Sequence, residues 1–177
     1  MGYLIPTAYS KEIGERLALH GIQTVARNKT ETLQVDVFRA AEVSFSNAPF
    51  EGRMRATLQG EWRKESQRVP EGSLLVPIAQ PRARLLMGLL EPKAPDSFAA
   101  WGFFNGCFEH KEHVEPYVAE QIAQAMLKND ATLAAEFHDK LKTDSSFAQS
   151  STARHEFFLR RHSSWDERLN LYPIYRI

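Results

Sequence analysis

The sequence predicts an α+β fold in which an antiparallel β-meander packs against several helices and the C-terminal half is helical. Two changes of pattern along the chain indicate this class. Helix-like spacing of apolar residues gives way to alternation in residues 33–62, and helical spacing returns from residue 96. The length of 177 residues is enough for one core without metal or disulfide support. We therefore expect a single α+β domain over residues 1–177.

The first expected helix spans residues 10–20. Ser10 is a suitable N-cap, and Ile13 and Leu17 lie one turn apart on the same face. Gly21 is typical of the residue that ends a helix, because glycine adopts the left-handed conformation without steric cost.

Period-two alternation predicts the strands of the sheet. Residues 33–37 and 43–45 indicate one or two half-buried strands, and residues 54–62 give the clearest one. Residues 70–72 read Pro-Glu-Gly and predict a turn, after which residues 73–78 are expected to pair back as the next strand. The inner face of the clearest strand is expected to carry Met54, Ala56, Leu58, Gly60 and Trp62.

Proline positions delimit the helices of the middle of the chain. Pro81 suits a first helical turn, and Pro92 ends the helix that follows it. The main helix is expected to begin near Glu115, because Pro116 is tolerated in a first turn or at a kink. Its inner face is expected to carry Val118, Ile122 and Met126.

Polar residues mark the starts of the last helices. Asp130 is expected to cap a helix with an apolar face, and either Ser151 or Thr152 is expected to open another. Residues 171–177 read as a terminal strand. The apolar residues at i,i+4 spacing after Asp130 are Leu133, Phe137 and Leu141.

Composition excludes some classes of partner. The 22 Lys+Arg and 22 Asp+Glu give a formal net charge of zero, which argues against a dedicated nucleic-acid binder. No apolar run approaches the length of a membrane span, so we expect no membrane insertion. The lone Cys107 leaves the redox compartment open. Oligomeric state is also not readable from the sequence.

The densest polar cluster follows Phe108. Two histidines three residues apart are conceivable metal ligands, but the cluster lacks the Glu-x-x-His pattern of carboxylate-bridged sites. No histidine in the chain begins the His-x-x-Glu or His-Glu-x-x-His patterns of zinc peptidases. We therefore expect neither a catalytic residue nor a metal ligand. The candidate docking or functional segment is Phe108, Glu109, His110, Lys111, Glu112 and His113.

Aromatic side chains cluster just before that segment. Such rings most often fill a core, and part of the cluster is also suited to a docking face. Cys107 lies in the same apolar setting and reads as a core residue, since its thiolate would be poorly solvated there. The candidate aromatic face consists of Trp101, Phe103 and Phe104.

Short motifs follow one another in order along nearly the whole chain. They are Tyr3-Leu4-Ile5-Pro6, His20-Gly21-Ile22, Pro49-Phe50-Glu51-Gly52-Arg53, Pro70-Glu71-Gly72-Ser73, Gln80-Pro81, Leu89-Leu90-Glu91-Pro92, Asp96-Ser97-Phe98, Trp101-Gly102-Phe103-Phe104-Asn105, Phe108-Glu109, Lys111-Glu112 and Tyr172-Pro173. In this order, the motifs resemble the C-terminal extension of bacterial zinc carboxypeptidases of the carboxypeptidase A type.

The resemblance implies an accessory role. In that family the zinc ligands, the catalytic glutamate and the arginine that binds the substrate carboxylate belong to the preceding peptidase domain. This chain would then be a non-catalytic docking domain that packs on the peptidase domain and stabilises or shapes it, with zinc held by that domain. A periplasmic or secreted location would follow. Met1-Gly2 directly before the first motif suggests a domain excised from a larger peptidase.

Two other functions stay open at this point. Residues 109–113 are conceivable as an independent hydrolytic site, since paired carboxylates and histidines are acid–base groups. The same segment is also conceivable as part of a site for a small molecule or a peptide. Where the family extension often reads Phe-Glu-Gln-Lys-Glu-Tyr, this chain has histidine in place of the glutamine and of the tyrosine.

Overall fold

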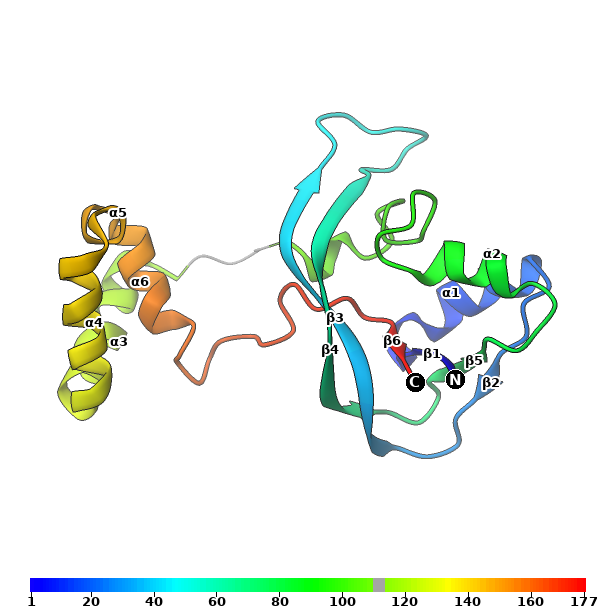
Figure 1. Cartoon of the computed structure of the whole chain (residues 1–177), viewed down its shortest axis with the longest axis horizontal. Helices are drawn as coiled ribbons and strands as arrows, with labels where there is room; N and C mark the ends of the chain where they lie inside the picture. The colour runs from blue at the N-terminus through cyan, green and yellow to red at the C-terminus, as the bar shows by residue number, and fades with distance from the viewer. Residues whose placement is uncertain (110–113) are drawn as a thin grey trace. The chain divides into compact units, whose positions relative to one another are not determined.

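The computed structural model describes residues 1–109 and 114–177 (Figure 1). Contacts within the chain divide it into two compact units, and we describe each by itself. One unit, here called the sheet unit, consists of Met1–Glu109 and Arg168–Ile177. The other, here called the helical unit, is His110–Glu167, of which residues 114–167 are described. The single domain over residues 1–177 stays a prediction.

The sheet unit confirms the α+β class. It combines a six-stranded antiparallel sheet with two α-helices and a short 3-10 helix. Its elements in chain order are β1 (Gly2–Ile5), α1 (Thr7–Leu19), β2 (Val25–Ala26), β3 (Glu31–Phe45), β4 (Ala56–Val69), β5 (Leu74–Pro77), α2 (Ala83–Leu90), η1 (Asn105–Cys107) and β6 (Tyr175–Arg176).

The order of the strands in the sheet differs from their order along the chain. It is β2-β5-β1-β6-β3-β4, so β5 pairs with β1 and β2. The prediction that residues 73–78 pair back on the preceding strand was therefore wrong, because among the described strands β4 pairs with β3 alone. No strand was predicted at β1. All four residues of β1 are buried, and a central place between β5 and β6 satisfies its backbone groups on both sides.

The predicted alternation in residues 54–62 corresponds to the start of β4. Ala56 and Leu58 are buried as expected, whereas Met54 precedes the strand and is 39% exposed. Trp62 is half-buried rather than fully buried, and its ring centroid lies 5.6 Å from that of Phe38. The two predicted stretches before it form one long strand, β3, which pairs with β4 and has a bulge near Ala40.

Helix α1 begins three residues before the predicted start. Pro6 precedes it, and the Ser10 hydroxyl donates a hydrogen bond to the Thr7 carbonyl inside the first turn instead of capping the helix. Gly21 has a φ of 66° and ends the helix as predicted. Helix α2 ends before Pro92 as predicted, whereas Pro81 precedes the N-cap residue Arg82 and does not lie in the first turn.

The main core lies on one face of the sheet. Alternate residues of β1, Tyr3 and Ile5, face this core, and Leu4 belongs to a second cluster on the other face. Helices α1 and α2 contribute buried leucine and isoleucine side chains. The largest fully buried side chains of the main core are Phe38, Phe104, Tyr172, Ile5, Ile13, Leu17, Leu86, Leu90 and Ile174.

Residues 114–167 of the helical unit form four α-helices (Figure 1). They are α3 (Pro116–Asn129), α4 (Ala131–Thr143), α5 (Ser145–Gln149) and α6 (Ser151–Leu159). The predicted start near Glu115 and the helical C-terminal half are confirmed. The short helix α5 was not predicted.

Side-chain caps fix the turns between these helices. Asp130, Asp144 and Ser150 each accept a hydrogen bond from the backbone N–H three residues later, at 2.9, 3.0 and 3.1 Å. The cap at Asp130 was predicted. Helix α6 begins at Ser151, one of the two predicted opening residues, and the Ser150 side chain makes the capping bond.

A bidentate ion pair lies on the β3–β4 hairpin. Arg39 Nε and Nη2 donate to the two carboxylate oxygens of Glu65 at 2.6 and 2.9 Å. These hydrogen bonds hold the pKa of Glu65 below its ordinary value, so its stabilising contribution is present above the unfolded pKa, near 4.5, and is lost as pH falls through the lower folded pKa.

We expect Glu65→Gln to lower the free energy of unfolding by about 1 kcal/mol at neutral pH, since the pair is partly exposed. The difference from the unchanged chain should shrink as the pH falls below about 4.5, because protonated Glu65 resembles glutamine. Thermal unfolding at pH 7 and pH 3 measures this. Glu61→Gln is the matched control, since the Glu61 side chain is 77% exposed. A difference of equal size at both pH values would contradict the prediction.

No helix among the described residues has the length and apolar character needed to cross a membrane.

Candidate docking site

The predicted functional segment begins in the core of the sheet unit. Phe108 is 6% exposed and belongs to the main core, and Glu109 is exposed. The remaining members of the segment lie outside the described residues: His110, Lys111, Glu112 and His113. Their docking or functional role stays a prediction.

The three rings of the candidate aromatic face have different environments. Phe104 is 1% exposed, and its ring makes edge contacts with Tyr9 and Tyr172 at centroid distances of 5.1 and 5.5 Å. It therefore belongs to the core and not to the surface. Trp101 and Phe103 are half-buried, so each presents part of its ring to solvent.

Arginines cover the exposed parts of these two rings. The guanidinium carbons of Arg53 and Arg16 lie 3.7 and 4.6 Å from the Phe103 ring centroid, and that of Arg55 lies 4.9 Å from Trp101. These distances are within the range of cation–π attraction. The exposed ring of Phe50 lies 5.9 Å from that of Trp101. We call this surface the arginine–aromatic face; it consists of Arg16, Phe50, Arg53, Arg55, Trp101 and Phe103.

The loop between β3 and β4 positions half of this face. Phe50 and Arg53 exchange backbone hydrogen bonds of 2.9 and 3.0 Å across a tight turn. Glu51 and Gly52 form the turn with φ values of 48° and 77°. Glycine at the second position avoids the steric cost of the left-handed conformation.

A second set of contacts ties the loop to the aromatic segment. The Asn105 side-chain amide donates to the Met54 carbonyl at 2.9 Å. Gly102 has a φ of 73°, and a Cβ there would lie 2.2 Å from the same carbonyl oxygen. Only glycine permits this close approach, so the loop and the rings hold a fixed arrangement.

The face carries positive charge with little local compensation. Arg16 has an ion pair with Glu12 at 3.4 Å, and Arg55 donates to the Pro95 carbonyl at 2.6 Å. Within residues 1–109 and 114–177, Arg53 and Arg55 have no carboxylate at salt-bridge distance. Arginine next to exposed aromatic rings is typical of the energetically important part of protein–protein interfaces.

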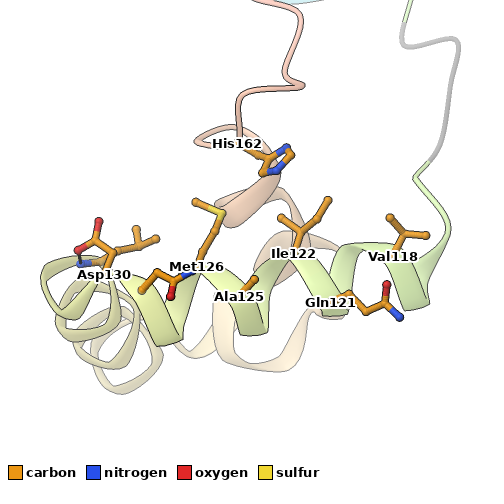
Figure 2. A pocket seen from close by; sticks show the side chains of 9 residues that line it. Val118, Gln121, Ile122, Ala125, Met126, Asp130 and His162 are labelled. Atoms are coloured by element: carbon orange, nitrogen blue, oxygen red, sulfur yellow. Dashed lines mark hydrogen bonds between the residues drawn. The ribbon is translucent and has the colours of Figure 1, made fainter.

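A hollow on helix α3 corrects one prediction. The predicted inner face of Val118, Ile122 and Met126 lines an open hollow of about 470 Å³ in the helical unit, and Figure 2 shows these side chains on one side of the helix with His162 across from them. Ala119 and Ala123 are the buried residues instead. The i,i+4 spacing was correct, but small alanines allow closer helix packing than the larger side chains.

Cys107 does not lie in a group of candidate ligands. Its sulfur is 3.1 Å from the Tyr9 hydroxyl, and it is half-buried against the main core. Burial raises the pKa of Tyr9 well above its ordinary value. The described residues contain no group of three or more His, Cys, Asp or Glu side chains placed to hold a metal ion.

Part of the chain is similar to named carboxypeptidases. A stretch of 100 residues is 32% identical to Carboxypeptidase 2 of Trichophyton rubrum. The proteins of the same name from Trichophyton tonsurans and Trichophyton equinum are 31% identical over 100 residues. The match covers 56% of this chain but 18% of each relative. No protein-family model and no solved structure matches. The chain is thus related to carboxypeptidases over part of its length.

Four of the six residues of the arginine–aromatic face were named from the sequence, and Phe50 was among them only as part of the motif that also contains Arg53. Trp101 and Phe103 were predicted as surface candidates, and Arg53 was noted within a motif. Arg16 and Arg55 were missed, because they come from a helix and from the base of a hairpin loop. The signal available in the sequence was the pair of arginines, Arg53 and Arg55, beside the turn at Glu51-Gly52.

Proposed function

We propose that the chain is a non-catalytic accessory unit of a secreted zinc carboxypeptidase-like protein. It docks through the arginine–aromatic face on an acidic surface of the catalytic domain and stabilises or shapes that domain. A position after the catalytic domain and a bacterial source are parts of the same proposal. Zinc belongs to the catalytic domain.

Three observations support an accessory rather than a catalytic role. The similarity to carboxypeptidases covers 18% of the relatives' length. The complete sequence contains neither the His-x-x-Glu nor the His-Glu-x-x-His pattern. The observation that carries the proposal is the arginine–aromatic face, where the guanidinium carbon of Arg53 lies 3.7 Å from the centroid of a half-buried ring.

The chemistry of the face indicates an acidic partner. Two arginines without a carboxylate partner among the described residues gain charge-assisted hydrogen bonds when aspartate or glutamate approaches. The aromatic rings beneath them exclude water, which strengthens those bonds. Docking on the folded catalytic domain would raise the stability of that domain, and when the chain is supplied as a separate protein this gain grows with the logarithm of its concentration above the dissociation constant.

We expect Arg53→Ala to weaken binding to the catalytic domain by about 30-fold, the effect of losing about 2 kcal/mol at an interface hot spot. The stability of the isolated chain should change by about 1 kcal/mol or less, since a partly exposed cation–π contact contributes little. Isothermal titration calorimetry against a carboxypeptidase catalytic domain from the same organism measures the affinity. Arg63→Ala is the matched control, because Arg63 is a 62% exposed arginine outside the face.

Two results would contradict the proposal. One is equal affinity of the Arg53 and Arg63 variants. The other is hydrolysis of C-terminal peptide reporters by the isolated chain that disappears in Glu109→Gln while the fold is retained. The second result would favour an independent hydrolase that uses residues 109–113.

A further inference from the structure

Strand β4 is a long edge of the sheet. It has 14 residues and lies at one end of the strand order, with β3 as its neighbour. Edge strands present a row of backbone donors and acceptors to which another chain can add. The other edge, β2, has 2 residues and offers little for pairing.

The backbone groups at this edge can be assigned from the pairing of β3. The Phe38 carbonyl accepts from Tyr172 N–H at 2.9 Å, and Ala40 N–H also donates outside the β3–β4 ladder at 2.9 Å. Their partners across that ladder are Trp62 and Gly60. Residues of a non-hydrogen-bonded antiparallel pair direct their N–H and C=O groups away from each other. Trp62 and Gly60 therefore direct these groups to the open edge.

Backbone groups of every second residue in a strand point to the same edge, so this assignment extends along β4 in both directions from Gly60 and Trp62. Ala56 N–H, on the same alternation, donates to the Ala100 carbonyl at 3.1 Å and so ends the open edge at that side. Among the described residues, β4 makes no other backbone hydrogen bond outside its ladder with β3. The residues with outward backbone groups along the open edge are Leu58, Gly60, Trp62, Lys64 and Ser66.

We propose that two copies of the chain pair through β4, antiparallel, with Trp62 opposite Trp62 of the second copy. A symmetric pair places its central residue opposite its own copy. Centring on Glu61, Arg63, Lys64 or Glu65 would therefore place like charges face to face, which destabilises a ladder. Of the five positions 61–65 around the midpoint of β4, Trp62 is the one at which the central pair carries no charge.

Charge complementarity then supports the register centred on Trp62. Glu61 lies opposite Arg63 of the second copy, and Arg63 lies opposite Glu61, so two ion pairs form. Both side chains are exposed, with 62% for Arg63 and 77% for Glu61, and within one chain they form an ion pair at 3.7 Å that the facing charges of the second copy would extend. The same register pairs outward backbone groups with outward backbone groups, and it brings two half-buried indole rings together on one face.

Charge exchange tests the register in the full chain. Glu61→Arg and Arg63→Glu should each raise the dissociation constant of the dimer by about tenfold or more, because both ion pairs become repulsive contacts. The double exchange Glu61→Arg with Arg63→Glu should restore dimerisation. Sedimentation equilibrium over a range of concentrations measures the constants, and far-UV circular dichroism confirms that each variant is folded.

A proline variant tests the backbone pairing. Lys64→Pro removes an outward N–H without removing a donor to β3, and proline is tolerated at such edge positions. It should abolish the dimer, whereas Lys64→Ala, which keeps the N–H, should not. A chain that is monomeric at all concentrations would overturn the proposal. So would a dimer that is insensitive to the single exchanges, or one that the double exchange fails to restore.

Discussion

Phe104→Ala is expected to lower the free energy of unfolding of the sheet unit by about 3–5 kcal/mol, the usual cost of removing a buried phenylalanine ring. Phe104 is 1% exposed and contacts Tyr9 and Tyr172 edge to face. The loss combines the transfer free energy of the ring with the cavity left between α1 and the C-terminal segment. Urea denaturation followed by tryptophan fluorescence measures it.

The neighbouring Phe103 provides the control. Its ring is half-buried below Arg16 and Arg53, so Phe103→Ala should cost clearly less than Phe104→Ala. Equal losses for the two variants would show that the division between core and docking face is wrong. A loss below about 1 kcal/mol for Phe104→Ala would contradict its place in the core.

Phe137→Ala is expected to lower the free energy of unfolding of the helical unit by about 3–5 kcal/mol. Phe137 is at the centre of an aromatic cluster, with ring centroids of Phe147, Phe157 and Phe158 at 5.8, 5.5 and 4.7 Å. Its removal takes away three ring contacts at once, in a unit with few other large buried side chains. Loss of helical circular dichroism in urea measures the effect.

Tyr117→Ala is the control for the helical unit, since Tyr117 is 66% exposed on α3. It should change the free energy of unfolding by about 0.5 kcal/mol or less. The prediction for Phe137 fails if both variants unfold at the same urea concentration.

Local patterns in the sequence were sufficient for the features that depend on near neighbours. Alternation identified the inner residues Ala56 and Leu58, the cap at Asp130 was readable from residue type, and Gly21 marked the end of α1. Each of these depends on backbone geometry within a few residues. The α+β class followed from the same local signals.

Features that depend on distant partners were not readable. The central place of β1 depends on pairing with β5 and β6, which lie far along the chain. On α3 the fully buried residues are Ala119 and Ala123, next to the predicted face, whose Met126 is half-buried against the core of the helical unit. The arginine–aromatic face brings Arg16 into contact with Phe103. These two residues lie far apart in the sequence, and no periodic pattern predicts that they meet.

Hydrogen–deuterium exchange of the chain, alone and bound to the carboxypeptidase catalytic domain, tests the docking claim most directly. Docking through the arginine–aromatic face predicts added protection of backbone amides in residues 50–55 and 98–103 in the complex, since these residues form the face and its support. Protection confined to other regions, such as the hollow on α3, or no change in any amide at saturating concentrations of the catalytic domain, would contradict it.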